Sequence, residues 1–222
     1  MSDLVQLSGP AFGPASGGTP NNLVILLHGY GANGDDLIGL ATPFSQVLPN
    51  TEFLSPNAPY PCESNPFGGL QWFEVWQAEG VDRLKEVRNG AAIVNAYIDA
   101  ELAKRDMTDD NLILCGFSQG TMLSLHIALR RSKPCAGVLG YSGRLESPEI
   151  LAGEITTRPP VMLIHGEEDP MLAINLMDTA AAVMTENGVA VECHRRPGLG
   201  HGIDPDGVRL GADFMLARFS KG

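Results

Sequence analysis

The residues with the clearest chemical signature form the segment GFSQG at 116–120, which matches the pattern G-x-S-x-G. The segment directly follows an apolar run, LILC, and directly precedes TMLSLHIAL, a run typical of a helix. This strand–turn–helix setting is that of a nucleophile elbow, in which glycines let the strand and the helix approach closely around a strained serine. The alternative is a serine in an ordinary glycine-rich turn. The context favours Ser118 as a nucleophile.

A serine hydroxyl becomes a good nucleophile only when a base accepts its proton. His201 is the favoured base because it lies in a glycine-rich loop after the last predicted strand, and because elbow triads run in the order Ser, Asp or Glu, His. A histidine that caps a turn is the alternative. The other four histidines fit structural roles better, since each lies within or at the end of a predicted element: His28, His126, His165 and His194.

The acid that would orient the imidazole is predicted to be Asp169, on a loop after the predicted strand at 161–165. Four acidic residues nearby in the sequence compete with it: Glu167, Glu168, Asp204 and Asp206. The last two fit better as caps of the final helix. The oxyanion would need two backbone N–H donors, of which Gln119 supplies one. The second is expected from the glycine-rich loop at 28–36, in which His28 fits an anchor better than a catalyst.

The composition narrows the classes of function. The 222 residues include 26 acidic and 15 basic side chains, which give a net charge of −11. This charge argues against nucleic acid and anionic membranes as partners. The first basic residue in the chain is Arg83. The acidic first third is interpreted as a solvated face, or alternatively as an entrance that disfavours anionic substrates.

No metal or cofactor is expected. The sequence holds no HExxH, clustered Cys/His or calcium-loop pattern, and no GxGxxG or Walker loop. The four cysteines are widely spaced, and the sequence begins without a basic n-region or an apolar h-region. These features predict reduced cysteines in a cytoplasmic protein. The uncharged run at 111–129 is interpreted as the buried centre of a sheet, not as a membrane span.

The elements that must position these residues alternate along the chain. Strands are predicted at 23–28, 51–55, 112–116, 136–141, 161–165 and 189–194. Helices are predicted at 35–48, 86–105, 120–131, 171–187 and 206–219, with Pro43 expected to kink or shorten the first of them. The alternation predicts one domain, 1–222, with a three-layer α/β fold and a mostly parallel sheet.

Two segments interrupt this alternation. Residues 1–22 are rich in Gly, Pro and Ser, and they are predicted to form an edge hairpin or a strap. Residues 56–84 are predicted to form a long loop near the site. This loop carries four large aromatic residues: Phe67, Trp72, Phe73 and Trp76.

Six strings together resemble the phospholipase/carboxylesterase family of α/β-hydrolases, which includes acyl-protein thioesterases and bacterial carboxylesterases. They are LLHGYGANGDDL (26–37), SPNAP (55–59), QWFE (71–74), GFSQG (116–120), HGEEDP (165–170) and GLGHGI (198–203). The resemblance implies a serine hydrolase without a large cap domain. It also implies Ser118, Asp169 and His201 as the triad, with the backbone N–H groups of Tyr30 and Gln119 as oxyanion donors.

The resemblance further implies a substrate pocket beside the QWFE tract and after the acid. Its expected contacts are Leu70, Trp72, Phe73, Met171 and Leu172. Trp72 is equally interpretable as a core aromatic. The family commonly has Val-Pro after the acid, where this chain has Pro170 followed by MLA. The difference bears on the shape of the pocket wall and leaves the triad unaffected.

The sequence thus predicts a carboxylesterase that works through an acyl-enzyme on small-molecule esters. Acyl-protein thioesterase and lysophospholipase activity, with the same triad, are the alternatives. Acyl transfer to an acceptor other than water is a further one, and a non-catalytic binding protein is a remote one. The acidic balance favours neutral aliphatic or aromatic esters. A homodimer is the default expectation if the chain assembles.

Overall fold

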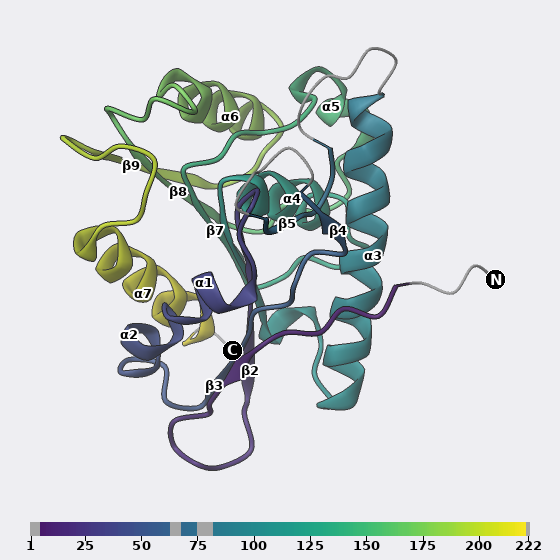
Figure 1. Ribbon diagram of the computed structural model, residues 1–222, viewed down its shortest axis with the longest axis vertical. Helices are drawn as coiled ribbons and strands as arrows, with labels where there is room; N and C mark the ends of the chain where they lie inside the picture. Colours follow the sequence, from purple (N-terminus) through teal and green to yellow (C-terminus); the bar gives the residue numbers. More distant parts are fainter. Residues whose placement is uncertain (1–4, 63–67, 75–81, 221–222) are drawn as a thin grey trace.

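The computed structural model describes residues 5–62, 68–74 and 82–220 (Figure 1). Its centre is a seven-stranded sheet with the order β1-β3-β2-β6-β7-β8-β9. All neighbours pair in parallel except β1, which is antiparallel to β3. The strands are β1 (Ala11–Phe12), β2 (Asn22–Leu27), β3 (Thr51–Leu54), β6 (Leu112–Phe117), β7 (Gly137–Tyr141), β8 (Val161–Gly166) and β9 (Val191–Arg196).

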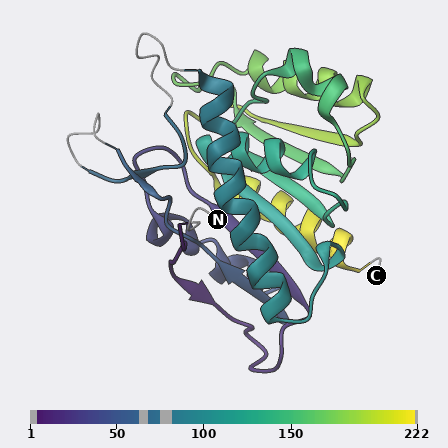
Figure 2. The same cartoon turned by 90° about the vertical axis from the view of Figure 1, so that its right-hand side faces the viewer.

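Helices cover both faces of this sheet, and Figure 2 shows α3 crossing one of them. Alternate residues of β2 enter two separate cores: Leu23 and Ile25 pack on one side, Val24 and Leu26 on the other. Burial on both faces explains why the central strands read as continuous apolar runs. The first side carries α3 (Arg83–Lys104), α4 (Gln119–Ala128), α5 (Leu151–Glu154) and α6 (Asn175–Glu186). The second carries α1 (Gly34–Ile38), α2 (Ala41–Ser45) and α7 (Pro205–Phe219). The predicted three-layer α/β fold is confirmed.

The predicted helix at 35–48 is wrong, because the structure has two short helices there, α1 and α2. The chain breaks at Gly39 and Leu40, ahead of Pro43. A proline ring clashes with the carbonyl four residues earlier in a continuous helix, but it is tolerated in the first turn. Starting a new helix at Ala41 places Pro43 in that first turn. The sequence predicts a kink or a shortening of this helix at Pro43, whereas the structure has a complete break a few residues earlier.

The last strand and the last helix also differ slightly from the predicted bounds. β9 begins at Val191 rather than at 189, because the Val189 N–H donates to the Met184 carbonyl and completes the end of α6. Asp204 accepts a hydrogen bond from the Gly207 N–H at 2.8 Å and is the N-cap of α7. The prediction that this aspartate caps the final helix is confirmed.

The two irregular segments both contact the sheet edge or its loops. In the segment 1–22, β1 pairs with β3, and the carbonyl groups of Ser8 and Pro10 accept from Asn57 and Ser55. In the loop 56–84, β4 (Tyr60–Pro61) and β5 (Leu70–Gln71) form an antiparallel pair. Residues 63–67 and 75–81 of this loop, with Phe67 and Trp76, lie outside the described residues.

The uncharged run at 111–129 forms β6 and α4, as predicted, and α4 is buried throughout its length. Among the described residues, no helix combines the length and apolar character needed to cross a membrane.

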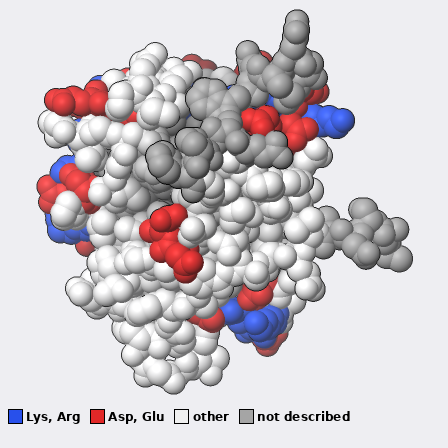
Figure 3. All heavy atoms as spheres, in the orientation of Figure 1, with Lys and Arg blue, Asp and Glu red and all other residues white. Residues whose placement is uncertain are grey.

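All four cysteines are free, and three of them are buried. Burial raises the pKa of Cys135 to about 12. On the face shown in Figure 3, charged groups form separate small clusters, including an acidic one over α1.

Candidate active site

Ser118 lies on a strained turn between β6 and α4. Its φ of 53° and ψ of −114° are unusual for a residue with a side chain. A Cβ added to Gly116 would lie 2.4 Å from the Gly120 backbone, and one added to Gly120 would lie 1.8 Å from the Leu27 carbonyl oxygen. Glycine is therefore required on both sides of the serine. The Ser118 N–H donates to the Tyr141 carbonyl at 2.9 Å, which ties the turn to β7.

Asp169 lies on the loop after β8, and both of its carboxylate oxygens are engaged. Oδ2 accepts from His201 Nδ1 at 2.7 Å. Oδ1 accepts from the N–H groups of Met171 at 2.8 Å and of Leu172 at 2.9 Å. Because these two N–H groups serve the carboxylate, the helix predicted at 171–187 begins only at Asn175. Burial alone would raise the pKa of Asp169, but the donors from Leu172, His201 and Met171 outweigh it and hold the pKa below its usual value.

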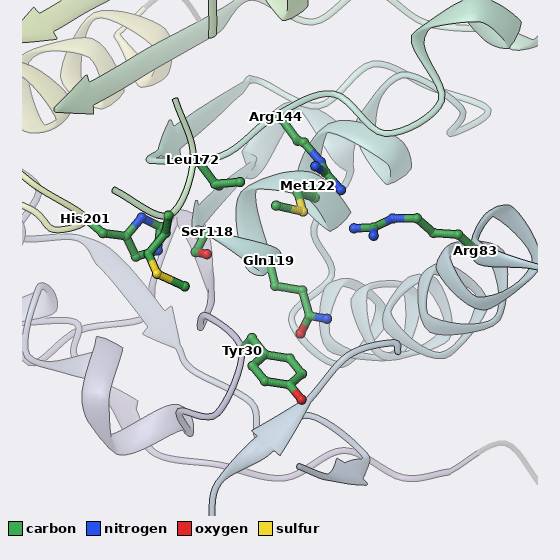
Figure 4. A pocket seen from close by; sticks show the side chains of 9 residues that line it. Tyr30, Arg83, Ser118, Gln119, Met122, Arg144, Leu172 and His201 are labelled. Carbon is green, nitrogen blue, oxygen red and sulfur yellow. The ribbon is translucent and has the colours of Figure 1, made fainter. Parts of the chain in front are cut away.

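His201 is oriented from two sides. The Phe117 ring packs against its imidazole with ring centroids 4.9 Å apart. Nδ1 can only donate to the carboxylate of Asp169, so Nε2 is left as the acceptor nitrogen. Ser118 and His201 both line one pocket, where Figure 4 shows them as neighbours. This arrangement can move a proton from the serine hydroxyl to the imidazole.

His165, at the end of β8, is a second histidine beside Asp169. Its Nε2 lies 2.8 Å from the Leu172 carbonyl oxygen and 3.2 Å from Asp169 Oδ2. Both partners are acceptors, so this nitrogen carries the proton. The His165 side chain is buried, as is the Asp169 carboxylate that it contacts. The sequence indicated only that His165 ends a strand, and its contact with the acid depends on the loop fold.

The pocket at the elbow has a volume of about 220 Å³. The described residues that line it come from six separate parts of the chain. They are Tyr30, Arg83, Ser118, Gln119, Met122, Arg144, Met171, Leu172 and His201. Its wall therefore combines apolar side chains with two arginines beside the serine (Figure 4). Among the described residues, no group of three or more His, Cys, Asp or Glu side chains is placed to hold a metal ion.

The predicted oxyanion donors, Tyr30 and Gln119, both line this pocket. Gln119 begins α4, and the first N–H groups of a helix have no acceptor within the helix. In the loop after β2, the N–H of Gly31 donates to the Leu70 carbonyl and that of Ala32 to the Gly29 carbonyl. Those two hydrogen bonds hold the loop in place beside Leu70.

Of the five predicted substrate contacts, Met171 and Leu172 line the pocket. Leu70, Trp72 and Phe73 are not among its described lining residues. Trp72 and Phe73 are buried, and both belong to the core on the α3 side of the sheet. The interpretation of Trp72 as a core aromatic therefore describes its position better than a pocket contact does.

Trp72 and Phe73 instead connect the glycine-rich loop at 28–36, called the oxyanion loop below for its predicted role, to the elbow at Gln119. The side chain of Gln119 accepts from the Trp72 N–H at 2.9 Å and donates to the Phe73 carbonyl at 2.6 Å. The Trp72 indole N–H donates to the His28 carbonyl at 2.9 Å. The His28 ring in turn contacts the Gly29 carbonyl at 2.8 Å and accepts from the Ala58 N–H at 3.0 Å. Burial lowers the pKa of His28, which suits an anchor that stays neutral.

The contact between Leu70 and the oxyanion loop leads to a test with a matched control. A Cβ on Gly69 would lie 2.0 Å from the Gly31 carbonyl oxygen, whereas a Cβ on Gly68 would meet nothing within 4 Å. Both glycines have positive φ, so alanine introduces similar backbone strain at each. We expect Gly69→Ala to displace the loop and lower kcat by about 100-fold, with Gly68→Ala close to wild type. Equal effects of the two variants on kcat would contradict the role of this contact.

Sequence reasoning missed Arg83, Arg144 and His165 as neighbours of the site. Arg83 had a weak signal, since it is the first basic residue after an acidic third of the chain. Arg144 also had one, because it follows β7 at the carboxyl edge of the sheet, where side chains of parallel strands gather. Neither signal identifies a pocket residue without the tertiary structure.

The parallel sheet, the strained elbow serine and the Asp–His pair define an α/β-hydrolase. Comparisons with known proteins narrow the class further. Residues 15–217 match the family model for phospholipase/carboxylesterase. The chain is 30% identical over 206 residues to acyl-protein thioesterase 1 of Schizosaccharomyces pombe, covering 88% of this chain and 87% of the relative. The protein belongs to the phospholipase/carboxylesterase family and is a hydrolase of esters or thioesters.

Two further similarities agree with this assignment. A probable carboxylesterase of Arabidopsis thaliana, SOBER1-like, is 30% identical over 209 residues, covering 88% of this chain and 78% of the relative. The crystal structure of esterase PE8 superposes with a TM-score of 0.89 at 36% identity, covering 96% of this chain and 99% of that one. No large cap is evident in the described part of the fold.

Proposed function

We propose that the protein is a serine carboxylesterase that hydrolyses carboxylic esters through an acyl-enzyme intermediate. The observation that carries the proposal is the 2.7 Å contact between His201 Nδ1 and Asp169 Oδ2, made by a histidine that shares a pocket with the elbow serine. In this proposal Ser118 is the nucleophile, His201 the base and Asp169 the residue that orients the base.

The proposed reaction has two halves. Ser118 Oγ attacks the ester carbonyl while His201 Nε2 accepts the hydroxyl proton, and the negative charge develops within reach of the N–H groups of Tyr30 and Gln119. His201 then donates the proton to the departing alcohol, which leaves an acylated serine. In the second half a water molecule gives a proton to His201 and attacks the acyl carbon. His201 then returns the proton to Ser118 Oγ as the bond between Oγ and the acyl carbon breaks, which releases the carboxylic acid and restores the free serine.

Thioesters are the second candidate substrates. The relative from Schizosaccharomyces pombe is named an acyl-protein thioesterase, and the same attack on a thioester carbonyl would release a thiol. The apolar side chains of Met122, Met171 and Leu172 support an acyl group as the part of the substrate in the pocket. The predicted cytoplasmic location and homodimer stay predictions.

The test compares oxygen esters and thioesters that share one acyl group, from acetyl to dodecanoyl. We expect a burst of alcohol or thiol release equal to the enzyme concentration whenever deacylation is slower than acylation. Mass spectrometry of the quenched protein should then find the acyl group on the peptide that contains Ser118. Turnover without any acylated serine would contradict the acyl-enzyme mechanism. The ratio of kcat/KM between matched esters and thioesters decides between the two substrate classes.

A further inference from the structure

We propose that Arg83 and Arg144 form an anion subsite in the pocket, and that the preferred substrates are esters or thioesters that carry a carboxylate or phosphate group. The inference rests on the proposed function, because it assumes that the pocket beside Ser118 holds the substrate. It adds the chemical class of the group that the pocket recognises.

The two arginines reach the pocket from different elements and share one carboxylate. Arg83 is the first residue of α3, and Arg144 lies on the loop after β7. Arg83 donates through two nitrogens to both oxygens of Glu146, at 2.8 and 3.0 Å. Arg144 Nε donates to Glu146 Oε1 at 2.8 Å. The Glu146 side chain is only 5% exposed, and its ion pairs hold both guanidinium groups in position.

The described lining of the pocket carries positive charge. Arg83 and Arg144 both line it, whereas Glu146, which contacts both of them, is not among its described lining residues. Within the described part of the chain, these arginines are the only side chains of permanent charge that line the pocket. The Arg83 and Arg144 side chains keep 26% and 29% of their surface exposed, whereas Glu146 is covered. A substrate anion bound there would contact the exposed parts of these guanidinium groups.

Arg144 offers the donors for such an anion. Its Nε is used by Glu146, while its two terminal nitrogens have no hydrogen-bond partner among the described residues. Figure 4 shows the guanidinium groups of Arg83 and Arg144 directed toward the same space beside Met122. Arginine can bind carboxylate and phosphate through two parallel hydrogen bonds, and hydrogen bonds to charged groups are the stronger ones.

A second cluster of two arginines and one glutamate provides a comparison for the pair at the pocket. Arg88 and Arg130 share Glu154 in the same two-to-one arrangement. Arg88 and Glu154 are absent from the described lining of the pocket, and Arg88 is half-exposed on α3. The Arg88 guanidinium is hydrated, because about half of its side chain is exposed. Arg88 therefore provides a matched control for removing one arginine.

The permanent charges among the described lining residues of the pocket are opposite in sign to the net charge of the whole chain. The net charge of −11 led to an expectation of neutral esters, and of an entrance that disfavours anions. At physiological ionic strength, however, exposed charges are screened beyond roughly 8 Å. The binding of a substrate beside Ser118 is governed mainly by the pocket wall, whose described residues include two arginines. We therefore expect anionic esters to be preferred over neutral ones of similar size.

The experiment compares three methyl esters by methanol release: monomethyl adipate, neutral dimethyl adipate and methyl 5-phosphonopentanoate. We expect kcat/KM per ester group to be higher for the two anionic esters. Their relative rates identify carboxylate or phosphate as the better ligand.

Arg144→Gln should lower the anionic-to-neutral ratio of kcat/KM by at least about tenfold, while Arg88→Gln should leave this ratio unchanged. Arg144→Lys should retain part of the preference, and added salt should reduce it in the wild type.

A binding measurement separates this inference from the proposed hydrolase function. Monomethyl adipate is titrated into Ser118→Ala and into Ser118→Ala/Arg144→Gln, with melting temperatures as the check on folding. At least tenfold weaker binding to the double variant supports the subsite whether or not the wild type turns over any ester. Equal binding to both, or an anionic-to-neutral ratio that Arg144→Gln does not change, overturns it. Absence of turnover of every ester, with the binding difference intact, would instead refute the hydrolase function.

Discussion

Ser118→Ala is expected to lower kcat for ester hydrolysis by about 10⁴-fold or more and to abolish covalent labelling by a fluorophosphonate. The elbow turn exposes this one hydroxyl at the pocket beside His201, so its removal leaves the base without a nucleophile to activate. Substrate binding and the backbone N–H groups would remain. The residual rate should therefore stay above that of the uncatalysed reaction.

The control for this variant is Ser124→Ala. Ser124 lies in the same helix, α4, where its hydroxyl donates to the Gly120 carbonyl at 2.8 Å. It does not belong to the described pocket lining, so kcat should stay close to wild type. A Ser118→Ala protein that folds normally and keeps more than about a tenth of wild-type kcat would show that the nucleophile lies elsewhere.

Asp169→Asn is expected to lower kcat by about 10³- to 10⁴-fold without disturbing the fold. Two backbone N–H groups point at Oδ1, so the asparagine oxygen must occupy that position and the amide nitrogen must face His201. The His201 Nδ1 atom then accepts a hydrogen bond, and its proton moves to Nε2. In that tautomer the ring cannot take the proton of Ser118. The measurement is steady-state kcat together with the rate of fluorophosphonate labelling.

The same substitution has a pH-dependent effect on stability. Because the pKa of Asp169 is lowered in the folded protein, its contribution to the free energy of unfolding is present above the unfolded pKa and is lost as the pH falls through the folded one. The asparagine variant lacks this titration, so its stability should change less in acid. Glu168→Gln, at an exposed position beside the acid, is the control and should leave kcat and acid stability near wild type. Similar losses of kcat in both variants would contradict the role given to Asp169.

The elements that carry the site were predictable because their signals are local. Ser118 is identified by glycines two residues to either side and by the change from a strand pattern to a helix pattern. Gly116 and Gly120 follow from the close approach of the strand and the helix, which leaves no room for a Cβ at either position. The boundaries that failed depend on contacts beyond the local pattern. Asp169 captures the N–H groups of Met171 and Leu172 and so delays the start of α6.

The sequence by itself determined the fold class, the family, and the three residues that make up the candidate triad. Each of these leaves a pattern within about ten residues, because turns, strand ends and helix starts are built from neighbours in the chain. The tertiary structure alone decided that Trp72 belongs to the core and that Leu70 holds the oxyanion loop through its backbone. It also decided that Arg83 and Arg144 face the serine. Arg83 meets Glu146 across 63 residues of chain, and a contact at that separation exists only once the fold has brought the start of α3 beside the loop after β7.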